Sequence, residues 1–250
     1  MRNDYNHKLK SQFNNAKLIS QKIYYQNLYA KISDCFKQSD KILEIGAGAG
    51  ISQIFLSTWT IDRTDFLSWD DEVSVKGEIN AENLPFENDS YDIVFGVDIL
   101  HHLNSPVVAL NEVSRVLRKG GLAVFIEPYV SPFSYGVYKL FHDEQTSYRY
   151  NLQQTFETFD PREGDQGLAK ALFCNKSGKK LISEEVTAVS NIELDYMHPF
   201  SFFATGGLTK PINTGNMLIK VLLKIESYMP LFLLKVLGSR IRIVIKFKQQ

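Results

Sequence analysis

Apolar residues recur along this chain with two alternating spacings, and the alternation predicts an α/β fold. Between residues 9 and 36, and again between 107 and 117, apolar positions recur at the spacing of helices that pack on one side. Short apolar runs lie between these regions and predict strands at 41–45, 58–64, 78–86, 91–100 and 122–126. Strands that alternate with helices favour a doubly wound, mostly parallel sheet, which binds ligands at the carboxyl ends of its strands.

The second half of the chain predicts a lid, an insertion and two closing elements. The aromatic-rich stretch 129–150 predicts a lid helix over an acceptor pocket. Residues 145–215 are interpreted as a substrate-facing insertion that contains a sixth strand. Arg240–Lys248 alternates polar and apolar residues and predicts a seventh strand, antiparallel at the sheet edge, with Lys and Arg facing solvent. The predicted order is a helical cap, a ligand-binding core, a lid with the insertion, and a closing segment: 1–40, 41–130, 131–215 and 216–250.

A second amphipathic region, residues 216–237, allows two interpretations. Its apolar positions predict a helix that Pro230 interrupts, with Lys220 and Lys224 on another face. The run contains too many charges to span a bilayer, which needs about 20 mostly apolar residues. Either this helix packs on the sheet, or its apolar and Lys-bearing faces lie in the interface of an anionic membrane.

Composition and charge narrow the class of protein. The 250 residues, 44% of them hydrophobic, are enough for the core of one α/β domain. The formal net charge is zero, but residues 1–40 carry seven Lys and Arg against three Asp and Glu, and residues 209–250 carry eight against one. Basic ends of this kind compensate an acidic core or face an anionic partner. The start of the chain does not resemble a secretory signal, so we expect a cytoplasmic protein. With no P-loop, zinc motif or nucleic-acid module in the sequence, we expect neither a metal nor a nucleic acid as partner.

A glycine triplet follows the first predicted strand in KILEIGAGAGI. Gly46, Gly48 and Gly50 let the backbone approach a nucleoside-bearing ligand closely. The dinucleotide pattern Gly-x-Gly-x-x-Gly would require a glycine where Ile51 stands. The observed spacing, with Glu44 just before it, favours S-adenosylmethionine over a nicotinamide cofactor. The remaining alternative is a tight turn that binds nothing.

An acidic residue follows the second predicted strand. Asp65 stands where a carboxylate can accept hydrogen bonds from both ribose hydroxyls of an adenosine. Asp62 and Asp70 are rival candidates, and the alternative is a loop aspartate without a ligand.

Three segments, in this order and spacing, resemble the class I S-adenosylmethionine-dependent methyltransferases: LEIGAGAG at 43–50, NAENLPFENDSYDIVFGVDILHHL at 80–103 and EVSRVLRKGGLAVFIEP at 112–128. The resemblance extends most to the bacterial small-molecule branch that includes quinone-biosynthesis enzymes. Segments beyond residue 130 are similar to methyltransferases associated with surface polysaccharides. Asn80 departs from the aspartate usual at its position, which keeps an acceptor oxygen for adenine but loses the charge. The resemblance implies a seven-stranded Rossmann-like sheet, and cofactor contacts from Glu44, Ile45, Gly46, Ala47, Gly48, Gly50, Asp65, Asn80, Ala81, Val97 and Asp98.

Histidines near the strand ends are the candidate catalytic residues. A general base is needed only for hydroxyl or protonated amine acceptors, and histidine titrates in the required range. The candidate bases near the strand ends are His101, His102 and His142, and also Glu127, since a carboxylate can orient a histidine; the alternative is that the histidines only fill the structure. Because a histidine base is available, we expect methyl transfer to oxygen of a small-molecule or lipid-linked acceptor, such as a sugar or a phenol.

The competing hypothesis is a binding module that keeps the fold without turnover. Asn80 and the short helix predicted from Gly50 to Ser57 favour it.

Overall fold

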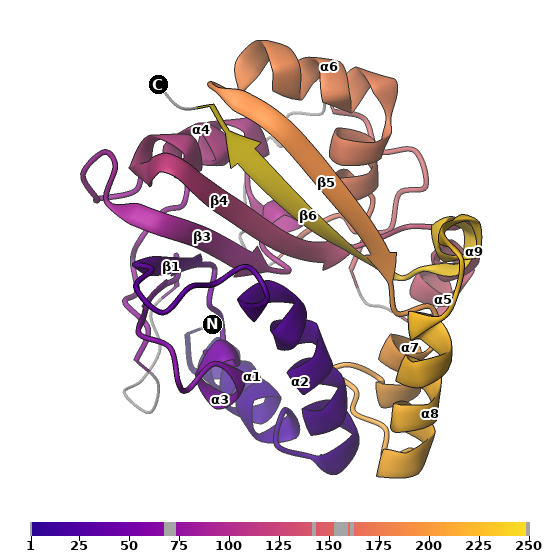
Figure 1. The fold of residues 1–250 in the computed structure, drawn as a ribbon. Helices are drawn as coiled ribbons and strands as arrows, with labels where there is room; N and C mark the ends of the chain where they lie inside the picture. The colour runs from indigo at the N-terminus through magenta and orange to yellow at the C-terminus, as the bar shows by residue number, and fades with distance from the viewer. Residues whose placement is uncertain (1, 68–73, 142–143, 153–159, 161–162, 249–250) are drawn as a thin grey trace.

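The computed structural model describes residues 2–67, 74–141, 144–152, 160 and 163–248. In this part of the chain a six-stranded sheet has the order β2-β1-β3-β4-β6-β5 (Figure 1). The first four strands in this order are parallel, and β6 is antiparallel to both of its neighbours. The α/β, doubly wound and mostly parallel fold is therefore confirmed. The strands are β1 (Ile42–Ile45), β2 (Ile61–Thr64), β3 (Tyr91–Val97), β4 (Leu117–Pro128), β5 (Val189–Met197) and β6 (Arg240–Phe247).

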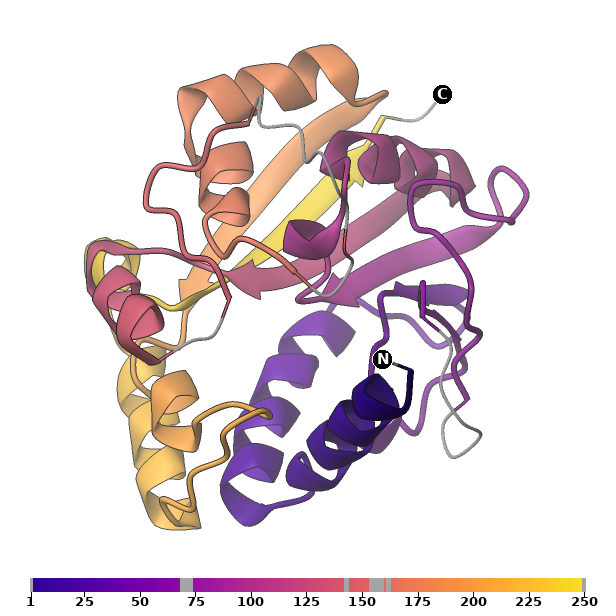
Figure 2. The same ribbon diagram turned by 180° about the vertical axis from the view of Figure 1, so that it is seen from behind.

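Helices cover both faces of the sheet (Figures 1 and 2). On one face α4 and α6 pack on β3, β4 and β6 through a core that includes Leu110, Phe125 and Phe173. On the other face α2 and α8 pack through Tyr24, Leu28 and Ile219. The helices are α1 (Arg2–Asn15), α2 (Ile19–Ser33), α3 (Ser52–Phe55), α4 (Pro106–Val116), α5 (Pro132–Phe141), α6 (Lys176–Glu185), α7 (Ser201–Thr205), α8 (Asn216–Ser227) and α9 (Leu231–Leu237), with short turns η1 (Leu100–His102) and η2 (Lys170–Cys174).

One of the predicted strands does not form. Residues 78–86 form no strand, because Glu78 adopts a positive φ of 61° and Asn80 Oδ1 accepts a hydrogen bond from Glu82 N, which turns the chain. In place of the expected strand, Lys76 forms an isolated parallel bridge with Thr64, the last residue of β2. The described residues therefore form six strands and not the seven expected.

The last strand differs from its prediction in place and in exposure. β6 lies between β4 and β5 and is not at the edge of the sheet; β5 occupies that edge. Arg240, at the start of β6, is 2% exposed instead of facing solvent, and Arg242 is half-buried. Lys246 does remain exposed.

The C-terminal helical region divides as predicted at Pro230, which precedes α9. Within α8, Ile219 and Glu226 are buried, and α9 has no buried residue. Among the described residues, no helix is long and apolar enough to cross a membrane.

Candidate active site

The polar residues predicted for the site meet at one edge of the sheet. Because β1 to β4 are parallel, their carboxyl ends lie along the same edge. The antiparallel β6 adds its first residue to this edge, since Arg240 is opposite Pro128, the last residue of β4. The edge therefore receives the glycine turn, the loops that follow β2 and β3, the end of β4 and the start of β6.

The glycine turn after β1 adopts a conformation that other residues rarely reach. Gly46, Gly48 and Gly50 have φ values of 64°, 50° and 66°. A Cβ on Gly46 would lie 2.3 Å from Cδ1 of Ile99, so this turn packs against the segment that follows β3. A Cβ on Gly48 would have no atom within 4 Å, which leaves open space above the backbone. Ala47 fixes the turn by donating its N–H to Thr64 O.

Asp65 reaches from the end of β2 into this turn. Its Oδ2 accepts a hydrogen bond from Gly48 N at 2.7 Å, and its Oδ1 accepts one from Leu67 N at 2.9 Å. Burial raises the pKa of Asp65 despite these bonds. Each carboxylate oxygen keeps a further lone pair for a hydroxyl donor. The rival Asp62 is bound instead by Lys76 Nζ and Tyr91 Oη, and Asp70 lies outside the described residues.

Glu44 is buried on β1, the strand that leads into the glycine turn. Its side chain is 2% exposed, and its Oε2 accepts a hydrogen bond from Ser52 Oγ at the start of α3. Arg63 Nε donates to the same hydroxyl at 2.8 Å and lies 3.5 Å from Glu44 Oε2. Burial raises the pKa of Glu44 to about 7 against these partners. Ser52 and Arg63, which the sequence analysis did not identify, thus tie α3 to β1 and β2.

The predicted adenine-binding loop is ordered by its own side chains. Asn80 is exposed and Ala81 is buried, and Asn80 Oδ1 accepts the N–H of Glu82 at 2.9 Å. Glu82 Oε1 in turn accepts the N–H of Ser105 at 2.7 Å. Asn80 retains one lone pair and its amide N–H groups for a ligand.

Asp98, next to the half-buried Val97, carries the principal charge after β3. It adopts a positive φ of 54°, and its Oδ1 is 2.5 Å from Nη2 of Arg240. Burial raises the pKa of Asp98, although Arg240 opposes this shift. The Arg240 side chain is 3% exposed and that of Asp98 is 40% exposed, so the carboxylate faces the open side of the pair. Arg240 was not predicted as a site residue; its position at the start of a predicted antiparallel strand was the available signal.

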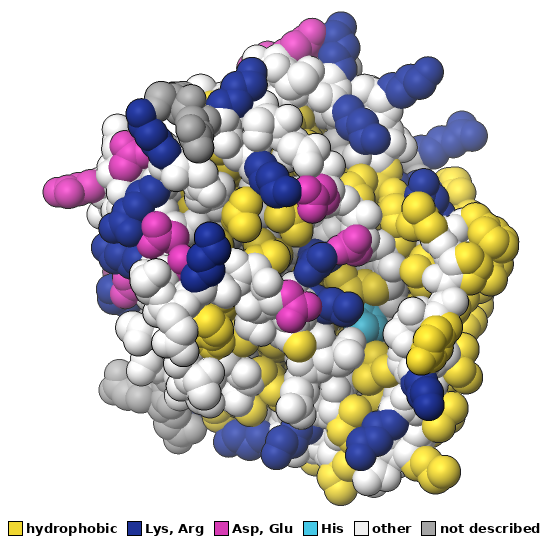
Figure 3. Space-filling model, in the orientation of Figure 1, with side chains coloured by type: hydrophobic (Ala, Val, Ile, Leu, Met, Phe, Trp, Pro, Cys, Tyr) yellow, Lys and Arg dark blue, Asp and Glu magenta, His cyan; other side chains and the backbone are white. Residues whose placement is uncertain are grey.

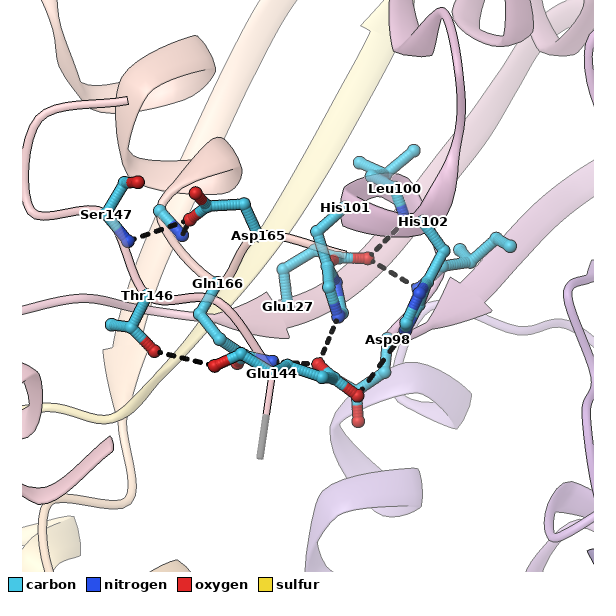
Figure 4. A network of polar contacts seen from close by, with 12 residues as sticks. Asp98, Leu100, His101, His102, Glu127, Glu144, Thr146, Ser147, Asp165 and Gln166 are labelled. Atoms are coloured by element: carbon cyan, nitrogen blue, oxygen red, sulfur yellow. Dashed lines mark hydrogen bonds and ion pairs between the residues drawn. The ribbon is translucent and has the colours of Figure 1, made fainter. Parts of the chain in front are cut away.

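His101 lies between two carboxylates (Figure 4). Its Nδ1 is 2.6 Å from Glu127 Oε2, and its Nε2 is 3.5 Å from Glu144 Oε2. The other Glu127 oxygen accepts hydrogen bonds from the N–H groups of Ile99 and Leu100. Burial alone would lower the pKa of His101, but the charge and the hydrogen bond of Glu127 raise it to about 10. His101 is therefore protonated at neutral pH and has no lone pair with which to accept a proton.

His102 has the opposite pKa shift. Burial, together with the positive charge of His101, lowers the pKa of His102 to about 4. Its Nε2 lies 4.0 Å from Glu144 Oε1, and the two imidazole rings are 4.2 Å apart. His102 is therefore neutral at neutral pH. The structure brings these two candidate histidines together, whereas His142 lies outside the described residues.

Two loop segments, 144–147 and 163–167, hold this cluster in place (Figure 4). Asp165 Oδ1 accepts the N–H of Ser147 at 2.9 Å, and Gln166 Nε2 donates to Glu144 Oε2. A Cβ on Gly164 would lie 2.7 Å from Cδ2 of His101, so the second segment packs directly on the histidines. The loops thereby fix Glu144 over both imidazole rings.

The same cluster contains donor types that divalent cations bind. His101, His102 and Glu144 bring one ligand atom each within 4.8 Å of one another, as do Asp98, His101 and Glu127. The hydrogen bond between His101 Nδ1 and Glu127 already uses the proton that a cation would have to displace. This geometry favours proton sharing between the histidine and the carboxylates.

Comparisons with known proteins agree with this arrangement. Residues 43–125 match the family described as Methyltransferase domain. An uncharacterized methyltransferase, YcgJ of Bacillus subtilis, is 30% identical over 116 residues, which are 41% of this chain and 46% of the relative. A sarcosine/dimethylglycine N-methyltransferase of Aphanothece halophytica is 30% identical over 104 residues, 35% of this chain and 38% of the relative. The chain thus spans less than half the length of these curated relatives.

Solved structures share the fold over a larger part of the chain. A SAM-dependent methyltransferase from Archaeoglobus fulgidus has a TM-score of 0.51 at 11% identity and covers 89% of this chain and 93% of its own. The [4+2]-cyclase SpnF also has a TM-score of 0.51, at 12% identity, over 90% of this chain and 82% of its own. These likenesses show the Rossmann-like methyltransferase fold and do not decide the reaction. Residues 43–125 thus match a methyltransferase domain family, and the chain has the Rossmann-like fold of methyltransferases.

Proposed function

We propose that the whole protein transfers a methyl group to a hydroxyl of a small-molecule or lipid-linked acceptor, such as a sugar or a phenol. The observation that supports this most directly is the His101, His102 and Glu144 cluster beside Asp98 at the carboxyl edge of the sheet. Proton-accepting groups at this point are what a hydroxyl acceptor needs. The resemblance to the bacterial small-molecule branch supports the same class of acceptor.

The residues at the edge fit S-adenosylmethionine. Open space above Gly48 admits a ligand against the backbone, and Asp65 offers lone pairs to ribose hydroxyls. The resemblance to methyltransferases assigns Asn80 and Ala81 to the adenine and Val97 and Asp98 to the methionine part, and the proposal adopts these roles. When bound, S-adenosylmethionine supplies a methyl group already activated on a positively charged sulfur.

The chain's own task is to align the acceptor and to accept its proton. Orientation of two reacting groups in a dry pocket can lower a barrier by about 7–11 kcal/mol. His101 is already protonated, so it orients Glu144 and does not act as the base. The neutral His102 takes the hydroxyl proton, and Glu144 stabilises the imidazolium that results.

A binding module without turnover is the second candidate. The four-residue α3 and the engagement of Asn80 Oδ1 by Glu82 favour it, because both reduce the polar groups offered to a cofactor. A methyltransferase-like fold is also found in a protein described as a cyclase. This candidate predicts S-adenosylmethionine binding that is weak, or binding without formation of S-adenosylhomocysteine.

Calorimetric titration of the full chain with S-adenosylmethionine, and separately with NADH, tests the cofactor. We expect micromolar binding of S-adenosylmethionine alone, and loss of that binding in Gly46→Val and Asp65→Ala. Asp62→Ala is the matched control, because Asp62 lies three residues before Asp65, within β2, and is bound by Lys76 and Tyr91. Equal affinity in the wild type and both site variants, or competition by NADH, would overturn the assignment.

Transfer of a labelled methyl group tests the acceptor. The acceptor screen begins with lipid-linked sugars and phenols and includes small amines, since one relative is a sarcosine/dimethylglycine N-methyltransferase. We expect His102→Gln to bind S-adenosylmethionine normally and to transfer to hydroxyl acceptors about a hundredfold more slowly. Transfer to amines alone, with no effect of His102→Gln, would contradict oxygen as the acceptor atom.

A further inference from the structure

Three helices at one side of the molecule expose a continuous apolar surface. On α8 the positions Met217, Val221 and Ile225 follow one another at helical spacing and end at Tyr228, which is 79% exposed. α9 adds Phe232, 66% exposed, and in Figure 3 yellow apolar atoms cover the right side of the molecule over α9 and α8. We call this surface the apolar face; its exposed members are Phe133, Leu140, Phe141, Met217, Leu218, Val221, Ile225, Tyr228, Leu231, Phe232 and Val236.

Exposure of this kind is unusual for a helix that serves only the core. α8 buries Ile219 against α2 and α9 buries no residue, although both helices are mostly apolar. Contiguous apolar surface of this extent marks a site of interaction.

The exposed charged residues of the three helices that form the apolar face have a single sign. Within α5, α8 and α9, all of whose residues the structure describes, the basic residues are Lys139, Lys220, Lys224 and Lys235, and all four are exposed. The one acidic residue of these helices, Glu226, is buried, where its carboxylate accepts the N–H groups of Phe200 and Ser201. An approaching surface therefore meets apolar side chains bordered by positive charge.

We propose that the apolar face binds the surface of an anionic lipid bilayer. Apolar side chains that insert at the headgroup level, flanked by lysines that contact anionic headgroups, are the recognised physical basis of interfacial binding. Tyr228 and Phe232 have the amphipathic or aromatic character that favours this depth. The absence of exposed carboxylates on the three helices favours anionic lipid over a mixed-charge protein surface. This binding stands apart from the proposed methyl transfer and can be tested without it.

The apolar face is joined directly to the active-site edge. α9 leads through two residues into Arg240, which pairs with Asp98. Tyr138 of α5 donates its hydroxyl to Ser239 O at 2.6 Å, which ties a second helix of the face to the same point. A protein seated on a bilayer through these helices would hold the candidate site close to the lipid surface, where a lipid-linked acceptor resides.

Cosedimentation of the full chain with vesicles tests the proposal. We expect binding to an equal mixture of phosphatidylglycerol and phosphatidylcholine, weaker binding at high salt, and little binding to phosphatidylcholine alone. Lys220→Gln with Lys224→Gln and Lys235→Gln should reduce partitioning by about a hundredfold. Tyr228→Ser with Phe232→Ser should reduce it by at least about tenfold.

Matched controls distinguish binding through the apolar face from non-specific effects of lost positive charge or lost exposed apolar surface elsewhere on the protein. Lys176→Gln with Lys179→Gln and Lys180→Gln removes three exposed lysines from α6, and Ile19→Ser removes an apolar side chain that is 62% exposed on α2. Both should leave partitioning unchanged, and circular dichroism checks that every variant is folded. Equal loss in the controls, or no vesicle binding, would overturn the proposal. Light scattering that shows a dimer dissociated by the Tyr228 and Phe232 substitutions, without vesicle binding, would assign the face to a second copy instead.

Discussion

At the scale of single residues, the pair Asp98–Arg240 gives the site its fixed charge. Arg240 is almost wholly buried, and its closest partner is a carboxylate that is 40% exposed. A buried cation needs such a partner, because an unpaired charge in the interior is strongly unfavourable. The pair therefore couples the start of β6 to the loop that follows β3.

Arg240→Met is expected to lower the free energy of unfolding by about 2 kcal/mol, less than for a wholly buried pair because Asp98 is partly exposed. Urea denaturation measures this change. Arg242→Met is the matched control on the same strand, since its partner Asp195 is 56% exposed, and should cost less than about 1 kcal/mol. Asp98→Asn combined with Arg240→Met should be less destabilising than the sum of the two single changes; simple additivity would contradict the pairing.

His101 is expected to make stability depend on alkaline pH. Its pKa is raised from 6.5 to about 10 in the folded protein, so its stabilising contribution is complete below pH 6.5 and is lost as pH rises toward 10. The difference in free energy of unfolding between the wild type and His101→Gln should shrink over this range by at least about 1.4 kcal/mol. Urea titrations of both proteins at pH 6.5 and pH 10 measure it. A constant difference would mean that His101 is neutral in the folded protein.

At the scale of elements, local sequence patterns predicted whether a segment is a helix or a strand better than they predicted where each strand lies in the sheet. The helix predicted from the apolar positions between 107 and 117 does form and begins at Pro106, where the proline and the Ser105 cap are local signals. The failed strand at 78–86 depended on the positive φ of Glu78, which no spacing of apolar residues reveals. The alternation in β6 was real, but the strand lies between β4 and β5, and only its first polar residue, Arg240, is buried, whereas Lys246 is exposed.

In the site, too, residues next to a strand in the sequence were predicted, whereas contacts between residues far apart in the sequence were not. The turn at Gly46 and the acid at Asp65 were predicted because both follow strands directly in the sequence. The contact of Glu127 with His101 joins residues 26 positions apart, and that of Arg240 with Asp98 joins residues 142 positions apart. Pairings of this kind follow from the order of strands in the sheet, which the sequence patterns left open.

At the scale of the whole molecule, β6 connects the edge strand β5 to the rest of the sheet. β6 pairs with β4 on one side and with β5 on the other, so β5 joins the sheet through it. The helices just before it, α8 and α9, lie at the surface with most of their apolar residues exposed. In the C-terminal region, the mostly buried strand β6 therefore directly follows helices α8 and α9, which bury few of their residues.

The rates of hydrogen exchange are expected to differ sharply between β6 and α9. Backbone amides of β6 are bonded on both sides and open only with the whole sheet, whereas α9 buries no residue and can open alone. Amides of β6 should therefore exchange on the order of a thousandfold more slowly than those of α9, and at rates close to those of β4. Mass spectrometry of peptides from 231–237 and 240–247 measures both in one experiment. Exchange of β6 as fast as that of α9 would mean that the final strand is not held between β4 and β5, and the position of Arg240 beside Asp98 would then have no support.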